Sequence, residues 1–86
     1  MDENQLFNEI VKLVRRLASG GDLPKGLTDA PLAATTQLDQ LGLDSMAKVS
    51  LVSAFDHYLG IYVDAETIPE DESLGALAQR LAKHRK

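Results

Sequence analysis

The sequence predicts an all-α fold: a small bundle of three main helices plus one short helix, with a long loop between the first and second main helices. Apolar residues recur at helical spacing in three stretches, at about 2–18, 45–59 and 73–83. Hydrophobic residues make up 44% of the chain and aromatic residues only 5%. The core is therefore expected to consist mainly of Leu, Ile, Val and Ala side chains, which suits packed helices.

The first helix is expected over residues 2–18. Its apolar stripe is formed by Leu6, Ile10, Leu13 and Leu17. Gly20 and Gly21 follow and can close the helix in a left-handed conformation.

A long loop then runs to about residue 43, with a short helical turn within 35–41. A loop of this length needs anchors in a compact domain, and its leucines are expected to supply them: Leu23, Leu27, Leu32, Leu38 and Leu41.

The second helix is expected from Asp44 or Ser45 to Tyr58 or Leu59, with Gly60 ending it. Two rows of apolar residues share its spacing, one with Met46, Val49 and Val52 (or Ser53), the other with Leu51, Phe55 and Leu59.

Residues 61–63 are expected as an extended connection, and Asp64 as the N-cap of one short turn before Pro69. The last helix is expected over about 73–83. Basic side chains near its end complement the negative end of the helix dipole: Arg80, Lys83 and His84.

Eighty-six residues indicate a single domain over 1–86, with 83–86 as a frayed tail. The chain has no cysteine, so disulfides and thiolate metal sites are excluded. No apolar run approaches the ~20 residues that span a bilayer. The polar, acidic start at Met1 is unlike a secretory signal. We therefore expect a discrete, cytoplasmic, monomeric protein without a membrane segment.

The formal net charge is −4 and the sequence pI is about 4.9. Nucleic-acid binding depends on Lys and Arg neutralising phosphates, so this balance argues against it and against a helix-turn-helix regulator. Carboxylates gather from Asp56 to Glu72, with no Lys or Arg among them. This acidic stretch is either a docking surface for basic partners or a solvated segment, and the sequence leaves both interpretations open.

The residues Leu41-Gly42-Leu43-Asp44-Ser45-Met46 stand where the loop turns into the second helix. Asp and Ser at a helix start are ordinary caps. A catalytic serine needs a nearby base, and the only histidines, His57 and His84, are expected far from Ser45. The start of a helix also attracts anions, so Ser45 suits an anionic modification better than catalysis.

The neighbours of Ser45 have expected roles of their own. Gly42 is expected to allow a close backbone approach that a side chain would obstruct. Asp44 is either a helix cap or a contact for a modifying enzyme and its metal. Met46 is either an exposed apolar contact or packs against the first loop. His57 either makes a pH-dependent contact or complements the helix dipole.

This six-residue motif matches the L-G-x-D-S-[LM] attachment motif, and the chain resembles the acyl carrier and peptidyl carrier proteins. The resemblance extends to the apolar positions of the second helix, to Ile61 and Val63, and to Ser73-Leu74 at the start of the last helix. It implies that Ser45 bears a covalent 4'-phosphopantetheine arm. Leu41 is then motif support, and four further residues are either motif support or partner contacts: Gly42, Leu43, Asp44 and Met46. It implies no catalytic residue and no resident metal.

The resemblance further implies a carrier that is a substrate of other enzymes. A phosphopantetheinyl transferase would attach the arm from coenzyme A with a magnesium ion. A loading ligase or acyltransferase would place an acyl or aminoacyl group on the arm as a thioester. Synthase or condensing enzymes would then use that group, since a tethered intermediate reaches a high effective concentration.

The second helix departs from the pattern of carriers in primary fatty-acid synthesis, which is strongly acidic. Here it holds one carboxylate, Asp56, and one lysine, Lys48. This difference favours a specialised polyketide, nonribosomal-peptide or fatty-acyl pathway. The alternative from another class is a helical protein-interaction module without a prosthetic group.

Overall fold

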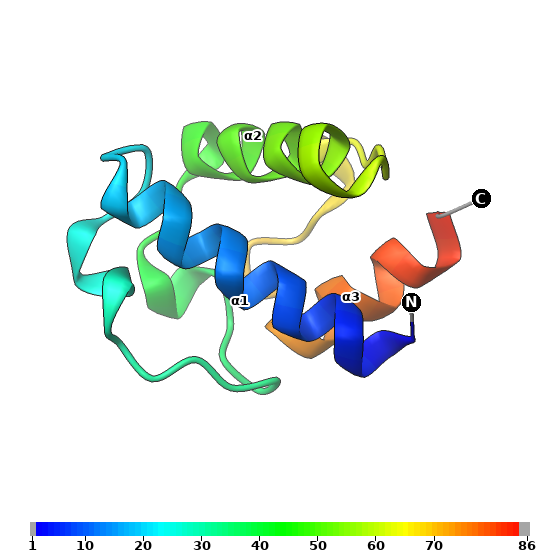
Figure 1. Ribbon diagram of the computed structural model, residues 1–86, viewed down its shortest axis with the longest axis horizontal. Helices are drawn as coiled ribbons and strands as arrows, with labels where there is room; N and C mark the ends of the chain where they lie inside the picture. Colours follow the sequence, from blue (N-terminus) through cyan, green and yellow to red (C-terminus); the bar gives the residue numbers. More distant parts are fainter. Residues whose placement is uncertain (1, 85–86) are drawn as a thin grey trace.

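The computed structural model describes residues 2–84, and this part of the chain contains three α-helices and no β-strand (Figure 1). The all-α prediction is therefore confirmed. The elements, in chain order, are α1 (Glu3–Ser19), η1 (Lys25–Thr28), η2 (Asp39–Leu41), α2 (Ser45–Ala54), η3 (Phe55–Leu59), η4 (Ala65–Thr67) and α3 (Leu74–His84).

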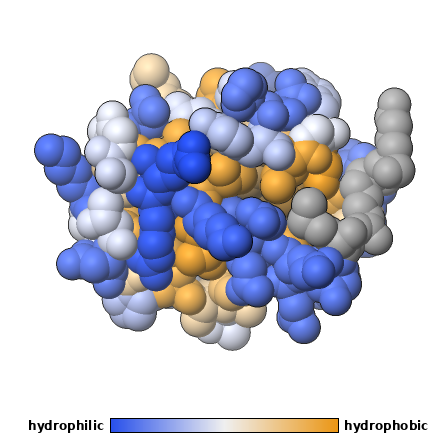
Figure 2. Space-filling model, in the orientation of Figure 1, coloured by the Kyte–Doolittle hydropathy of each residue, from blue (hydrophilic) through white to orange (hydrophobic). Residues whose placement is uncertain are grey.

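Helix α1 lies across the middle of the molecule and packs on both α2 and α3 (Figure 1). The hydrophobic side chains of the core are aliphatic apart from Phe55, as the composition predicts. Each fully buried Leu, Ile or Phe contributes about 1.5–3 kcal/mol of hydrophobic stabilisation. The face that α1 presents to the viewer is largely hydrophilic, with hydrophobic surface visible between the helices (Figure 2).

Helix α1 begins with a capping box. The Asp2 carboxylate accepts from the Gln5 N–H at 2.8 Å, and the Gln5 side chain accepts from the Asp2 N–H at 3.0 Å. Two otherwise free backbone donors are thereby satisfied. The helix ends at Ser19, and Gly21 adopts a φ of 90°. The predicted glycine termination of this helix is confirmed.

The long loop is anchored by its leucines, as predicted. Leu23, Leu27 and Leu38 are buried, and Leu32 and Leu41 pack partly against the core. An additional anchor comes from Arg15 on α1. Its Nη1 donates to the carbonyl oxygens of Leu27, Thr28 and Ala30 at 3.1, 3.2 and 3.1 Å.

The same loop pairs with the segment that leads into α3. Leu38 N–H donates to Glu72 O at 2.9 Å, and Leu74 N–H donates to Thr36 O at 2.9 Å. Gln37 and Ser73 form an isolated antiparallel bridge between these bonds. This short pairing fixes the loop just before the motif.

Helix α2 continues into η3, a π-helical turn, before Gly60 ends it with a φ of 68°. The predicted extent of the second helix, from Ser45 to Leu59, is confirmed. Its widening into a π-helical turn was not predicted.

Residues 61–63 form an extended connection, as predicted. The Asp64 side chain caps η4 by accepting from the Glu66 N–H at 3.0 Å, also as predicted.

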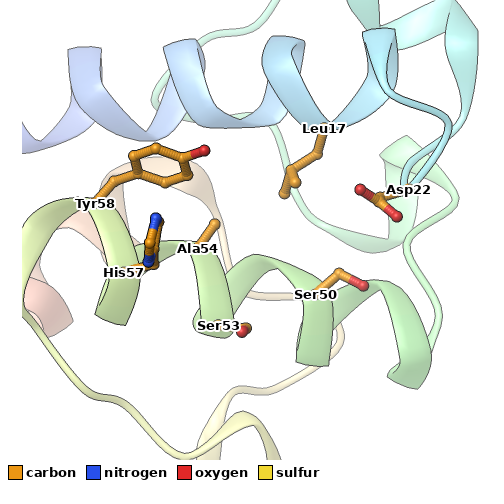
Figure 3. A pocket seen from close by; sticks show the side chains of 7 residues that line it. All are labelled: Leu17, Asp22, Ser50, Ser53, Ala54, His57 and Tyr58. Carbon is orange, nitrogen blue, oxygen red and sulfur yellow. The ribbon is translucent and has the colours of Figure 1, made fainter.

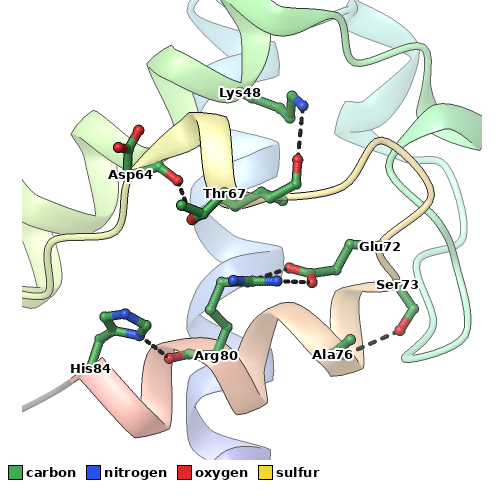
Figure 4. A network of polar contacts seen from close by, with 9 residues as sticks. Lys48, Asp64, Thr67, Glu72, Ser73, Ala76, Arg80 and His84 are labelled. Atoms are coloured by element: carbon green, nitrogen blue, oxygen red, sulfur yellow. Dashed lines mark hydrogen bonds and ion pairs between the residues drawn. The ribbon is translucent and has the colours of Figure 1, made fainter.

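Arg80 does not complement the end of α3, so that prediction was wrong. Its guanidinium donates two hydrogen bonds to the carboxylate of Glu72, at 3.0 and 2.7 Å (Figure 4). The hydrogen bond to Glu72 raises the pKa of Arg80, burial opposes this, and the charge of the carboxylate adds to it. A forked guanidinium is better satisfied by a carboxylate than by a helix end.

The end of α3 is helical through Lys83 and His84. His84 is exposed, and its Nδ1 lies 2.9 Å from Arg80 O. Residues 85–86 of the tail lie outside the described residues.

Gly75 tests the pairing between the loop and α3. A Cβ at this position would lie 3.0 Å from Ala34 O and 3.1 Å from Ala34 Cβ. Such crowding destabilises a core by about 1–3 kcal/mol. This cost outweighs the ~1 kcal/mol by which alanine is favoured over glycine within a helix. We expect Gly75→Ala to lower the free energy of unfolding by about 1 kcal/mol in urea titrations followed by circular dichroism.

Gly26→Ala is the matched control, because no atom lies within 4 Å of the new Cβ and its φ is not positive. Its effect should stay within about 0.5 kcal/mol. A Gly75→Ala protein as stable as the parent would show that this contact does not constrain the loop.

Candidate functional site

Ser45 is exposed and is the first residue of α2. Asp44 is the N-cap of this helix: its Oδ1 accepts from the Ala47 N–H at 2.8 Å. The cap leaves the N–H groups of Ser45 and Met46 outside the internal hydrogen bonds of the helix. The hydroxyl of Ser45 therefore stands at the positive end of the helix, open to solvent.

The turn before Ser45 is set by Gly42. This residue has a φ of 73°, and its N–H donates to Asp39 O at 3.2 Å. A Cβ placed at Gly42 would meet no atom of the described chain within 4 Å, so the close backbone approach expected at Gly42 is not one to another segment of this chain. Glycine is favoured instead because the turn requires the left-handed conformation.

Leucines on either side of Gly42 hold the turn against the core. Leu38 is fully buried and Leu43 is 5% exposed, while Leu41 is half-buried. Leu43 N–H also donates to Leu38 O at 3.3 Å, which closes the turn on itself. Leu41 and Leu43 are thus structural supports of the motif, and Ser45 follows them as the first exposed hydroxyl of the helix.

The residue after the serine is fully outside the core. Met46 is 78% exposed, so packing against the first loop is not its role. Val49 is also exposed, at 56%, whereas Val52 of the same row is buried, so this row is divided between the surface and the core. Helix α2 carries apolar side chains on more than one face, and its buried face instead uses Ala47, Lys48, Leu51, Val52 and Ala54.

Two connected grooves follow α2 away from Ser45, on the side of η4. The first, of about 220 Å³, is lined by Ser45, Met46, Lys48, Val49, Ala65 and Glu66. The second, of about 350 Å³, shares Val49 with it and continues to Tyr62, which is 67% exposed. A third groove, of about 480 Å³, lies between Asp44 and the loop residues 21–24. An elongated group attached at Ser45 would therefore have grooves beside it in which to lie.

Lys48 is a residue of the site that sequence analysis did not single out. It is 8% exposed, and its Nζ donates to Ile68 O at 3.0 Å (Figure 4). Pro69 follows Ile68 and disfavours a helical conformation at that residue, so η4 ends there. A lysine in an otherwise apolar helix face was the available signal, but its partner lies 20 residues away.

The opposite side of α2 faces α1 across a separate open pocket of about 290 Å³ (Figure 3). His57 lines it, together with Asp22, Ser50 and Ser53. Tyr58 closes one end, with its ring 5.0 Å from the guanidinium carbon of Arg16. At 1.5 Å per residue, His57 lies about 18 Å along the helix from Ser45, too far to act as its base.

Within residues 2–84, no group of three or more His, Cys, Asp or Glu side chains is placed to hold a metal ion. None of the helices in this range has the length and hydrophobicity that a membrane span requires.

The structure thus shows a small helical domain with a serine exposed at the start of α2. A family model described as the phosphopantetheine attachment site matches residues 26–81. The chain belongs to this family. Its members bear 4'-phosphopantetheine on a serine, and this chain is a phosphopantetheine-carrying protein. No curated protein and no solved structure gave a match.

The residues around Ser45 fit such a group. An exposed hydroxyl is accessible to an enzyme, the start of α2 favours an adjacent phosphate, and the grooves beside α2 can accommodate an extended chain. Two neighbouring carboxylates repel a phosphate, those of Asp44 and of Glu66 in the groove, and the hydrogen bond of Asp44 to Ala47 N–H explains the presence of Asp44.

Substitutions of Asp44 separate the cap from a contact with a modifying enzyme. Asp44→Ala should lower the free energy of unfolding by about 1 kcal/mol, because the Ala47 N–H loses its acceptor. Asp44→Asn should change it by only a few tenths, because both residues cap equally well. The measurement is urea unfolding, followed by the rate of Ser45 modification in each variant.

If capping is the whole role of Asp44, the Asn variant is modified at the parental rate. An Asn variant that is as stable as the parent but modified much more slowly would assign the carboxylate to recognition by the transferase.

Proposed function

We propose that Ser45 is the attachment point of the arm and that the protein carries acyl or aminoacyl groups as thioesters between partner enzymes. The observation that supports this most is the position of Ser45 as an exposed first residue of a capped helix, within the matched residues 26–81.

The other serines within residues 26–81 are less suited to the role. Ser73 caps α3, its Oγ accepting from the Ala76 N–H at 3.1 Å (Figure 4). Ser50 and Ser53 lie in the middle of α2 and line the pocket that faces α1 (Figure 3). Only Ser45 combines exposure with the free N–H groups of a helix start.

The chemistry at Ser45 is supplied from outside the chain. The Ser45 hydroxyl attacks the phosphate of coenzyme A that bears the pantetheine, its proton passes to a base of the transferase, and adenosine bisphosphate leaves. When bound, the arm supplies a terminal thiol that holds the cargo as a thioester. Asp44 and Gly42 keep the hydroxyl in place, and His57 lies too far along the helix to make this serine a catalytic nucleophile.

Partner docking is proposed on the η4 side of α2, which joins exposed apolar and acidic residues. Met46, Val49 and Tyr62 are the apolar part. Asp56, Asp64 and Glu66 line the grooves between them. Glu72 is unavailable for docking, since its side chain is 7% exposed and paired with Arg80. The acidic contribution to docking therefore comes from residues 56–71 rather than from the full stretch.

The weak acidity of α2 itself supports a specialised polyketide, nonribosomal-peptide or fatty-acyl pathway over housekeeping fatty-acid synthesis. Loading ligases or acyltransferases and condensing enzymes are the proposed partners.

A second candidate function is a helical interaction module without an arm, favoured by the exposure of Met46, Val49 and Tyr62. The same face serves both functions, so arm attachment decides between them.

The first test is intact mass after incubation with coenzyme A, magnesium and a broad-specificity phosphopantetheinyl transferase. The parent protein and Ser53→Ala should each gain one phosphopantetheine, and Ser45→Ala should gain none. Ser53 is the matched control because it is exposed on the same helix.

Modification of Ser45→Ala would place the arm elsewhere. A folded, initially unmodified parent that gains no mass, while a known carrier is modified in parallel, would favour the interaction module.

Docking is tested by charge reversal of Glu66 and Glu70. At low salt, Glu66→Lys/Glu70→Lys should reduce kcat/KM for modification about 5- to 10-fold, because complementary charge mainly steers association. The matched control is Glu9→Lys/Asp29→Lys, with the same net charge on α1 and the loop. Equal rates for both variants and the parent would remove these carboxylates from partner recognition.

A further inference from the structure

Lys48 is a charged side chain buried beside the attachment point. It is 8% exposed and is the one charged or polar residue among the buried residues of the described chain. No ion pair within residues 2–84 involves it. Burial of an ammonium group is unfavourable unless hydrogen bonds or an opposite charge compensate it. The interior position of Lys48 therefore requires an explanation beyond packing.

The contact with Ile68 O accounts for only part of the hydrogen-bonding capacity of Lys48. An ammonium group has three donors and no acceptor. The hydrogen bond to Ile68 O, at 3.0 Å, is the one that Nζ makes within the described residues. It satisfies the carbonyl at the end of η4 but supplies no negative charge. An anion near Nζ would complete the environment of this group.

Lys48 and Ser45 line the same groove. They are three residues apart on α2, a spacing that places their Cβ atoms about 5–6 Å from each other. Long side chains on a helix are directed toward its N-terminus, which here is Ser45. A phosphate bonded to Ser45 Oγ therefore lies within the reach of the Lys48 side chain.

The other charges near this groove do not replace such an anion. Glu66 lines the groove and Asp44 precedes Ser45, yet neither forms an ion pair with Lys48. Asp44 is directed to the Ala47 N–H instead.

We propose that Lys48 binds the phosphodiester of the arm on Ser45 while it keeps its hydrogen bond to Ile68 O. This proposal rests on the proposed attachment at Ser45. Lys48 then links the arm to η4, because one ammonium group holds both the phosphate and the carbonyl that ends η4. Attachment of the arm supplies the missing counter-charge, which stabilises the contact between α2 and η4.

The test compares protein with and without the arm in two backgrounds, the parent and Lys48→Met. Methionine keeps an unbranched apolar stem and removes the charge. In the parent, the arm should raise Tm by about 6–12 °C, the change expected of one hydrogen bond to a charged group in a domain of this size. In Lys48→Met, the arm should leave Tm unchanged. Lys48→Arg is the matched control and should keep most of the increase.

Amide hydrogen exchange gives a second measurement, located at η4. The arm should slow exchange of the Thr67 and Ile68 N–H groups in the parent and not in Lys48→Met. These groups donate to Asp64 O and Ala65 O within η4, so they report on its opening. Equal effects of the arm in both backgrounds would contradict the proposal, as would the absence of any effect in the parent.

A measurement on the parent alone covers the case in which Lys48→Met does not fold. In the arm-bearing protein, NMR should detect a through-bond or dipolar correlation between the Lys48 ammonium and the phosphorus of the arm. Its absence, with the Lys48 resonance assigned, would contradict the proposal. Intact mass is measured first in every case, so a protein that never gains the arm refutes the attachment at Ser45 rather than the role of Lys48.

Discussion

The presentation of Ser45 depends on backbone hydrogen bonds between the first loop and the start of α3. Between α1 and α2 the chain has only two short helical turns, which cannot fix its path. The hydrogen bonds at Leu38 and Leu74, with the bridge of Gln37 to Ser73, hold the loop against the helices. Gly42 then reverses the chain and Asp44 starts α2, so the serine has one defined position.

The sequence could predict the features that depend on neighbouring residues. Helix starts were predictable because Asp2, Asp44 and Asp64 cap their own helical segments. Helix ends were predictable where glycine follows, as at Gly60. The position of Ser45 at a helix start follows from the same local rules, and the motif around it is continuous in the chain.

Features that depend on distant residues were not predictable. Lys48 is buried because Ile68 O lies beside it, and Arg80 leaves the helix end because Glu72 is within reach. Apolar residues occur on several faces of α2, so periodicity could not show that Val49 is exposed. The π-helical turn at 55–59 has no sequence signal of comparable strength.

The pairing of the loop with α3 joins two distant parts of the chain into one cooperative unit. Leu38 and Asp39 donate to the carbonyls of Glu72 and Glu70, so these amides lose their partners when the segment before α3 opens. Opening of the segment at 70–72 therefore loosens the turn that carries Ser45, although the two are far apart in sequence. Sequence changes in the segment that leads into α3 thus act on the geometry of the turn before Ser45.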